Sequence, residues 1–425
     1  MQRNYSGHQE ILAPQRVYSN SSQLIAPTKS TIAGVIFSPS SALAISLIGY
    51  YPLASYTNFF FPEGSLGGII IRLMMLSSLG LIFFFTTKIR GVALTHLFIP
   101  AIIFMVLYIL RLLENFYIQN IDIIPGAQTI FSVFIFNALL PCIILSYFKS
   151  NLRDSDFAFA MSALAAIFLL GLTLNLDELA KTASSRLTLD RVNPIVLANT
   201  SIAFLQFQLL FFRQSNFIKI ATLVTTPFLL LVAILAQSRG PWLAAAGTLA
   251  FYIFVSQGRA RLFAIGAASL GVLLAFIYGS DYLAVIFNRF MFTDLNLDDS
   301  TFVHYQGITG AWKQFTDDIF FGRYAIEMVT GFYPHNIFLE APMSVGLLGA
   351  IPFFIHLGFA TLASIGIVRS RDSSLVAKFL ALTFVRESIV NSFAGSIWGA
   401  TSFWISSFMV IALWYGRRRN SPNQR

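Results

Sequence analysis

One histidine in the sequence has neighbours that could serve in proton transfer. His335 lies in the segment 331–340, GFYPHNIFLE, directly before a long apolar stretch. An imidazole group with a pKa near 6.5 can accept a proton from a hydroxyl group at neutral pH. His335 is therefore a candidate general base, although a hydrogen-bonded loop histidine would give the same pattern. His304, earlier in the same polar region, is a further candidate.

Several arginines lie between apolar stretches, where they could bind an anionic ligand. Arg239 stands in the run QSRGPW at 237–242, at the start of such a stretch. A guanidinium group can hold a phosphate through two parallel hydrogen bonds. A side chain that reaches the lipid headgroups is the alternative interpretation of Arg239. Other cations in comparable positions are Lys181, Arg186, Arg191, Arg289, Lys313 and Arg323.

The sequence contains no motif for a metal ion or a nucleotide. HExxH, a Cys/His cluster, a P-loop and GxGxxG are all missing from it. Cys142 is the only cysteine, which excludes an internal disulfide and a cysteine-based metal site. We therefore expect chemistry that uses neither a metal nor a cofactor.

The composition indicates that membrane helices position these residues. Of 425 residues, 56% are hydrophobic and only 11% are charged, whereas a soluble domain has about 25% charged residues. Helices that cross a bilayer need about 20 mostly apolar residues. Such stretches lie at 38–57, 66–86, 92–111, 128–148, 156–174, 194–212, 217–236, 240–256, 261–279, 344–368, 374–391 and 396–415. The predicted fold class is an all-α polytopic membrane bundle of about twelve transmembrane helices.

These stretches predict the organisation of the chain. We expect an N-terminal tail at 1–37, nine helices at 38–279, a long loop with short helices at 280–343, three helices at 344–415 and a basic tail at 416–425. A shorter loop is expected at 175–193. Loops of such length usually have a function.

Basic residues alternate between the predicted connections. One side carries Lys88, Arg90, Lys149, Arg153, Arg213, Lys219, Arg259, Arg261, Arg369, Arg371 and the arginines of the C-terminal tail. The positive-inside rule makes that side cytoplasmic. Both termini are then cytoplasmic, and both long loops face outward. The formal net charge of +9 is explained by topology and does not require nucleic acid as a partner.

Charged residues inside the predicted spans include Arg72, Lys378, Arg386 and Glu387. Ionisable side chains are costly in hydrocarbon and often mark functional positions. Arg72 and Lys378 lie near span ends, where they can reach the interface. Arg386 and Glu387 are adjacent and point about 100° apart on a helix, so a pair between them is not required.

A set of short motifs, taken in order, resembles the O-antigen ligase and O-antigen polymerase family. The motifs are SRG at 238–240, FFGR at 320–323, HN at 335–336, LE at 339–340 and GLLG at 346–349, preceded by Arg186 and by NP at 193–194. The resemblance covers roughly 186–350. It implies a multi-helix glycosyltransferase of the bacterial inner membrane with a periplasmic active site. The donor would be a glycan on undecaprenyl pyrophosphate, and the acceptor a sugar hydroxyl on lipid A-core or on a second lipid-linked glycan.

The residues suit an inverting transfer of this kind. Guanidinium groups can stabilise the charge that develops on a leaving pyrophosphate. We expect Arg239 and Arg186 to hold the pyrophosphate, with Arg191 or Arg289 in support. His335 would then be the general base and Glu340 its orienting partner. Arg323 and Asn336 are further candidates because they belong to the motifs.

Two questions stay open at this level. Twelve helices with both termini cytoplasmic also fit a transporter or flippase of lipid-linked glycans, although the outward long loops and the lack of a repeat between halves favour it less. A purely structural membrane subunit is a third interpretation. Within the enzyme class, the sequence does not separate a ligase from a polymerase.

Overall fold

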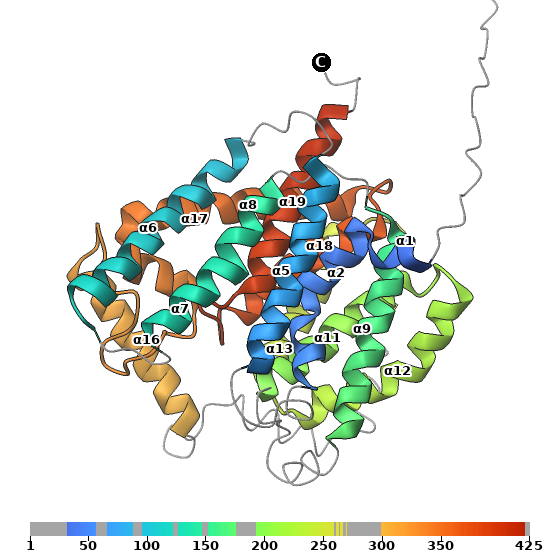
Figure 1. Ribbon diagram of the computed structural model, residues 1–425, viewed down its shortest axis with the longest axis horizontal. Helices are drawn as coiled ribbons and strands as arrows, with labels where there is room; N and C mark the ends of the chain where they lie inside the picture. Colours follow the sequence, from blue (N-terminus) through green and yellow to red (C-terminus); the bar gives the residue numbers. More distant parts are fainter. Residues whose placement is uncertain are drawn as a thin grey trace, which may run out of the picture.

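The computed structural model describes residues 32–56, 66–87, 96–121, 126–146, 152–175, 193–258, 261–262, 264–266, 269 and 299–420. These residues form helices joined by turns, and the described part contains one isolated β-bridge, between Glu327 and Phe332, and no strand. The helices gather into one bundle, with the C-terminal end of the last helix projecting from it (Figure 1). The predicted all-α class is confirmed.

The first half of the bundle contains both regular and distorted helices. Its elements are α1 (Ile32–Ile36), α2 (Pro39–Ile48), α3 (Tyr50–Ala54), α5 (Leu66–Thr87), η1 (His96–Phe98), α6 (Ile99–Leu113), η2 (Glu114–Ile118), α7 (Ala127–Val133), η3 (Phe134–Leu139), α8 (Leu140–Ser146) and α9 (Asp154–Leu174). The elements η2 and η3 are π-turns that continue an α-helix. Such turns are rare and are often found at functional sites.

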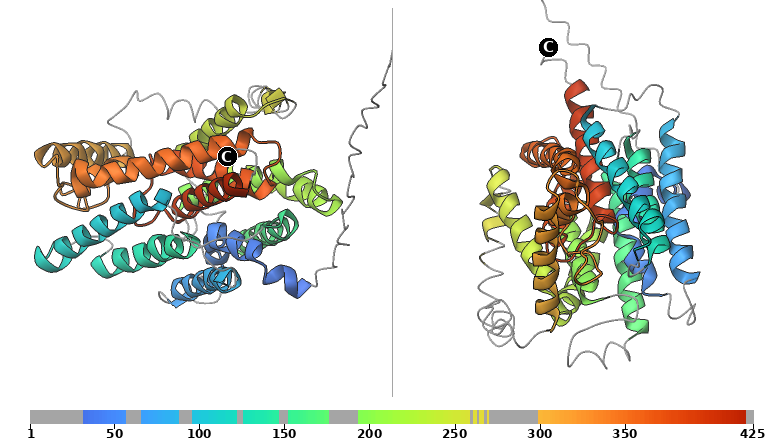
Figure 2. Two further views of the ribbon diagram at one scale, coloured as in Figure 1. Left: turned by 90° about the horizontal axis from the view of Figure 1, so that it is seen from above. Right: turned by 90° about the vertical axis from the view of Figure 1, so that its left-hand side faces the viewer.

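The second half supplies the centre of the bundle. Its helices are α11 (Pro194–Phe211), α12 (Asn216–Leu235), α13 (Arg239–Val255), α16 (Asp299–Asp317), α17 (Ile337–Arg369), α18 (Leu375–Val390) and α19 (Thr401–Asn420). Helix α17 packs on α6, α16, α18 and α19, while α18 also packs on α13. From above, α17 runs along the molecule with α16 against one end (Figure 2).

Five helical segments are long and apolar enough to cross a bilayer. They are His96–Ile118, Asp154–Leu174, Pro194–Phe211, Asn216–Leu235 and Ile337–Arg369. Further apolar helices of the described part are shorter, such as Thr401–Gly416. The chain is therefore a membrane protein. The count of twelve spans stays a prediction, and most of the predicted span at 261–279 lies outside the described residues.

Helix starts follow capping chemistry that is visible in the sequence. The side chains of Asn193, Ser215 and Ser374 each accept a hydrogen bond from a backbone N–H in the first turn of α11, α12 and α18. Such caps satisfy donors that a helix start leaves free. Asn336 does the same for α17, whose first turn starts at Ile337. A kink at Gly346 divides this helix, and its longer part follows the kink, close to the predicted span start at 344.

Helical residues also occur in both predicted tails. Helix α1 lies inside the expected N-terminal tail, and α19 continues to Asn420, into the expected C-terminal tail. Helix α1 is a separate short helix, because Ser38 caps the start of α2. Only α19 extends an apolar stretch, past its predicted end at 415.

Candidate functional site

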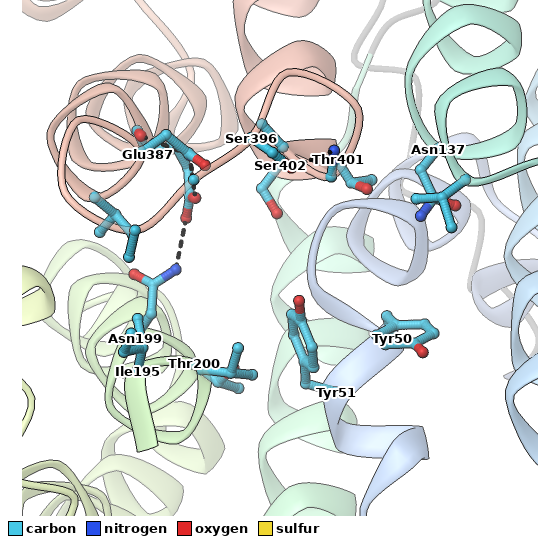
Figure 3. Close-up of a pocket in the computed structure, with 18 of the residues that line it drawn as sticks. Tyr50, Tyr51, Asn137, Ile195, Asn199, Thr200, Glu387, Ser396, Thr401 and Ser402 are labelled. Carbon is cyan, nitrogen blue, oxygen red and sulfur yellow. Dashed lines mark hydrogen bonds between the residues drawn. The ribbon is translucent and has the colours of Figure 1, made fainter. Parts of the chain in front are cut away.

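A cavity of about 410 Å³ lies where the ends of several helices meet. Its wall is formed by the end of α2, the start of α3, the first half of α5, α7 and η3, the first half of α11, the end of α18, the connector 391–400 and the start of α19. The side chain of Tyr51 points into the space bounded by Glu387, Asn199 and Ser402 (Figure 3). The cavity thus belongs to one end of the bundle.

The lining of the cavity is rich in aromatic rings and hydrogen-bonding groups. The rings are those of Tyr50, Tyr51, Tyr333 and Trp398, and the polar groups include Asn137, Asn199, Thr200, Asn391, Ser396, Thr401 and Ser402. Asn137 belongs to the π-turn η3. A surface of this kind offers stacking faces and many donors and acceptors, which is what a hydroxyl-rich ligand requires.

Arg386 and Glu387 form a buried ion pair at the cavity wall. Arg386 Nη2 donates to Glu387 Oε1 over 2.7 Å, and the two residues are 1% and 5% exposed. Asn199 Nδ2 donates to the same oxygen over 3.1 Å (Figure 3). The long arginine side chain bridges the angle between neighbouring helix positions, so the pair that the sequence did not require is present. Pairing is what permits two charges to be buried.

Several polar atoms of the cavity wall have no hydrogen-bond partner among the described residues. They are the Nε atoms of Arg72 and Arg386, Oδ1 of Asn199 and Nε1 of Trp398. Buried polar groups in native proteins are nearly always hydrogen-bonded. The cavity wall therefore contains hydrogen-bonding capacity that the described residues do not satisfy.

His335 lies next to the cavity. Its ring centroid is 4.4 Å from that of Tyr333, which lines the cavity, and 4.4 Å from that of His304 on α16. Burial, and then the neighbouring His304, lower the pKa of His335 to about 4. The imidazole is therefore neutral at pH 7 and able to accept a proton. Its Nδ1 atom is buried without a partner in the described part.

Tyr333 connects the histidine to the cavity. Its ring also meets that of Trp398, with centroids 5.6 Å apart and the planes nearly perpendicular. Burial, and then the nearby Glu340, raise the pKa of Tyr333 to about 12. The phenol therefore stays protonated at neutral pH and can act as a hydrogen-bond donor.

Glu340 and Asn336 have structural contacts. Glu340 is fully buried, and its oxygens accept hydrogen bonds from the Tyr108 hydroxyl over 2.7 Å and from Ile397 N over 2.9 Å. These bonds tie α17 to α6 and to the connector before α19. Both carboxylate oxygens thus accept hydrogen bonds from these groups, and the orienting role of Glu340 toward His335 stays a prediction. Asn336 caps α17.

Arg239 and His335 lie at the same end of the bundle. Arg239 begins α13, and a Cβ atom at Gly240 would lie 3.7 Å from Cβ of Phe393. Ile337 N, two residues after His335, donates to Asn391 O over 3.1 Å. Both residues therefore adjoin the connector 391–400, which also forms the cavity wall.

The other predicted arginines are either exposed or outside the described residues. Arg323 is exposed, and its guanidinium carbon lies 5.2 Å from the ring centroid of Tyr324. Arg186, Arg191 and Arg289 lie outside the described residues. No group of three metal-ligating side chains occurs in the part of the chain that the structure describes.

Sequence reasoning missed two residues that bind the backbone of the segment 321–325. Arg111 donates from Nε to Ser344 O and from Nη2 to Phe321 O and Gly322 O, each over 2.9 Å. Asn115, in the π-turn η2, accepts from Ala325 N over 2.8 Å and donates to Arg323 O over 3.2 Å. The only signal was a pair of polar residues, four apart, at the end of an apolar stretch.

Comparisons of the chain with family models, with curated proteins and with solved structures gave no match. Membership of the O-antigen ligase and polymerase family therefore stays a prediction that rests on the motif residues.

Proposed function

We propose that this protein is a membrane glycosyltransferase that moves a glycan from undecaprenyl pyrophosphate to a sugar hydroxyl. The observation that carries the proposal is the position of His335. The His335 ring lies 4.4 Å, centroid to centroid, from that of Tyr333, which lines a cavity suited to hydroxyl-rich ligands. Its pKa, lowered to about 4, leaves the imidazole unprotonated at neutral pH and makes it a weaker base than an ordinary histidine. A general base has to lie within reach of the hydroxyl that it deprotonates.

The proposed step is a single displacement. The acceptor oxygen forms a bond to the anomeric carbon of the donor while the bond from that carbon to the pyrophosphate oxygen breaks. The lipid pyrophosphate leaves with the bonding electron pair, and the hydroxyl proton passes to the His335 ring. Attack from the face opposite the leaving group inverts the anomeric centre.

Cations supply the electrostatic part of the proposal. Arg239 adjoins the connector that also forms the cavity wall, and it is our first candidate for binding the pyrophosphate. Arg186, Arg191 and Arg289 are expected to assist. Preorganised donors at a developing negative charge are worth about 3–4 kcal/mol each.

The ends of the helices support an outward-facing site. Asp154 at the start of α9 accepts from Leu375 N and Val376 N at the start of α18, so these two helices begin side by side. That end of the bundle is flanked in sequence by Arg153 and Arg371. The cavity lies at the end of α18, and the positive-inside rule then places it on the periplasmic side of the inner membrane, with both termini cytoplasmic.

The buried ion pair favours a second candidate function. Arg386 and Glu387 at a polar cavity inside a helix bundle are also typical of a transporter or flippase, in which intramembrane charges line a substrate path. A transporter moves its substrate across the membrane and forms no glycosidic bond. In detergent solution it would therefore yield no glycosidic product. Product formation therefore separates the two functions.

The direct test is transfer by purified protein in detergent, with a lipid-linked glycan as donor. His335→Asn keeps a polar side chain that tolerates the positive φ of 56° found at this position. We expect it to lower the rate by about 10²- to 10⁴-fold. The matched control, the exposed His96→Asn, should retain wild-type transfer, and EDTA should leave the rate unchanged. Wild-type activity in His335→Asn would remove the base from the mechanism.

The acceptor is identified by the surface glycans of a deletion strain. Long chains that are not attached to lipid A-core indicate a ligase. A core that carries a single repeat unit indicates a polymerase. An unchanged glycan pattern would indicate another acceptor, such as a capsule or an exopolysaccharide.

A further inference from the structure

Helix α16 exposes a stripe of apolar and aromatic side chains. Phe302, Tyr305, Ile308 and Trp312 are 50%, 58%, 42% and 58% exposed. Their spacing of three, three and four residues places them along one face of the helix. We call these four residues the α16 stripe. An exposed surface of this kind on a folded protein usually marks a site of interaction.

The other faces of α16 have different partners. Toward the protein, the His304 ring lies 4.4 Å from the His335 ring, and Gln314 Nε2 donates to Tyr324 O and Ile326 O over 3.0 and 3.1 Å. A third face carries the exposed polar residues Lys313 and Asp317. A helix with one packed, one apolar and one polar face is suited to lie at the boundary between protein, lipid and water.

The stripe continues into the apolar surface of a membrane-crossing helix. After α16, Phe320 and Phe321 are 60% and 66% exposed. Leu347 N and Leu348 N of α17 donate to Ile319 O and Phe320 O over 2.7 and 3.2 Å. Figure 2 shows α16 against the end of α17 in both views. Exposed apolar residues then follow along α17 at Leu347, Leu348, Ile351, Phe354 and Ile355.

We propose that the α16 stripe is seated in the lipid bilayer, at the headgroup and upper acyl-chain level. The occupant is lipid because the stripe is continuous with the exposed face of α17, which has the length and hydropathy of a transmembrane helix. Tyr and Trp are the residues enriched at membrane interfaces. The bilayer thereby braces α16 from outside, while His304, beside the stripe on the helix surface, lies against His335. The proposal does not depend on the proposed transferase activity.

The test uses spin labels on two faces of the same helix. Cys142, the only cysteine, is buried and is first replaced by Cys142→Ala. Full-length protein with Ile308→Cys or Lys313→Cys is labelled and placed in phosphatidylcholine–phosphatidylglycerol nanodiscs. Collisions with oxygen, which is concentrated in lipid, should dominate at position 308. Collisions with a water-soluble nickel chelate should dominate at position 313, which is the matched control.

A second measurement keeps the proposal open to refutation if a labelled variant does not fold. Trp312→Phe is conservative, and quenching by lipids brominated near the headgroups should be smaller in this variant than in wild type. A nickel-accessible label at position 308, or Trp312 emission quenched only by aqueous iodide, would overturn the proposal. A label at 308 that is shielded from both reagents in native membranes and freed in nanodiscs would instead indicate a protein partner, and would also overturn it.

Discussion

Gly322 and Gly346 lie back to back, and both have positive φ angles, 64° and 63°. A Cβ atom on Gly346 would lie 2.3 Å from Phe320 C, and one on Gly322 would lie 2.5 Å from Gly346 N. Gly346 interrupts α17 with a ψ of −175°, a conformation that essentially only glycine adopts. Two of the motifs behind the family resemblance, FFGR and GLLG, therefore meet at a single backbone contact.

This contact predicts that Gly346→Ala is strongly destabilising. The added methyl group meets backbone that cannot move aside, and the φ and ψ angles are strained for alanine. Together these effects should cost about 3 kcal/mol or more. The measurement is thermal unfolding in detergent at matched protein concentration. Gly358→Ala is the control in the same helix, because nothing lies within 4 Å of a Cβ atom there, and it should leave the Tm nearly unchanged.

Arg111 should be required for the order of the segment that it binds. Its guanidinium group serves three backbone carbonyls, those of Ser344, Phe321 and Gly322. Hydrogen bonds from a charged donor are worth about 1.5–3 kcal/mol. A lysine in Arg111→Lys cannot reproduce the planar arrangement of the guanidinium N–H donors. We expect faster trypsin cleavage after Arg323 and Lys313 in this variant. Arg213→Lys, at an exposed position, should leave the cleavage rate unchanged, and equal rates in the two variants would contradict the role of Arg111.

The helices could be predicted because one-dimensional patterns determine them. Apolar length located α5, α9, α11 and α12 within one or two residues, since hydrocarbon thickness fixes the length of a span. The hydropathy pattern predicts a span from 344, which lies close to the kink at Gly346, whereas the turns from Ile337 to the kink follow the Asn336 cap.

The site was less predictable because it depends on contacts between distant segments. Residue type predicts His335 and Arg239 as candidates, and the structure adds that their neighbours Ile337 and Gly240 lie against the connector 391–400. No local pattern marks that connector, or Tyr51 and Asn137, as parts of a cavity wall. Arg386 and Glu387 are predicted as functional positions because charged side chains are costly to bury in hydrocarbon. Their pairing depends on side-chain conformation, which periodicity does not encode.

The acid limb of the pH–rate profile should report His335. Its pKa is lowered to about 4, so the imidazole remains neutral, and able to accept a proton, at every pH well above that value. Transfer should persist when the pH falls from 7 to 5 and decline only as the pH approaches 4. An ordinary histidine would already lose activity near pH 6.5. The measurement is kcat/KM for the acceptor between pH 4 and 8.

His304 provides the control for this profile. Its charge contributes to lowering the pKa of His335, after the larger effect of burial. His304→Gln removes that charge, so the pKa of His335 should rise and the acid limb should move toward neutral pH.

The lowered pKa of His335 also makes the stability of the folded protein depend on pH. The lowered pKa means that unfolded chains bind more protons, so stability is complete above about 6.5 and decreases as the pH falls toward 4. An acid limb that His304→Gln does not move would contradict the coupling of the two rings.

The Arg386–Glu387 pair should show strong coupling in a double-mutant cycle. Arg386→Met alone leaves Glu387, which is 5% exposed, without its cation. Glu387→Met alone leaves the buried guanidinium group of Arg386 without its carboxylate partner. Each single change should cost about 3–5 kcal/mol, while the double change to two methionines should cost far less than their sum, because no unpaired charge is then buried. The free energy of unfolding in detergent measures the cycle. If the double variant is folded and yet forms no product, the cavity wall acts on the substrate as well as on stability. Additive losses would show instead that the two side chains stabilise the bundle independently.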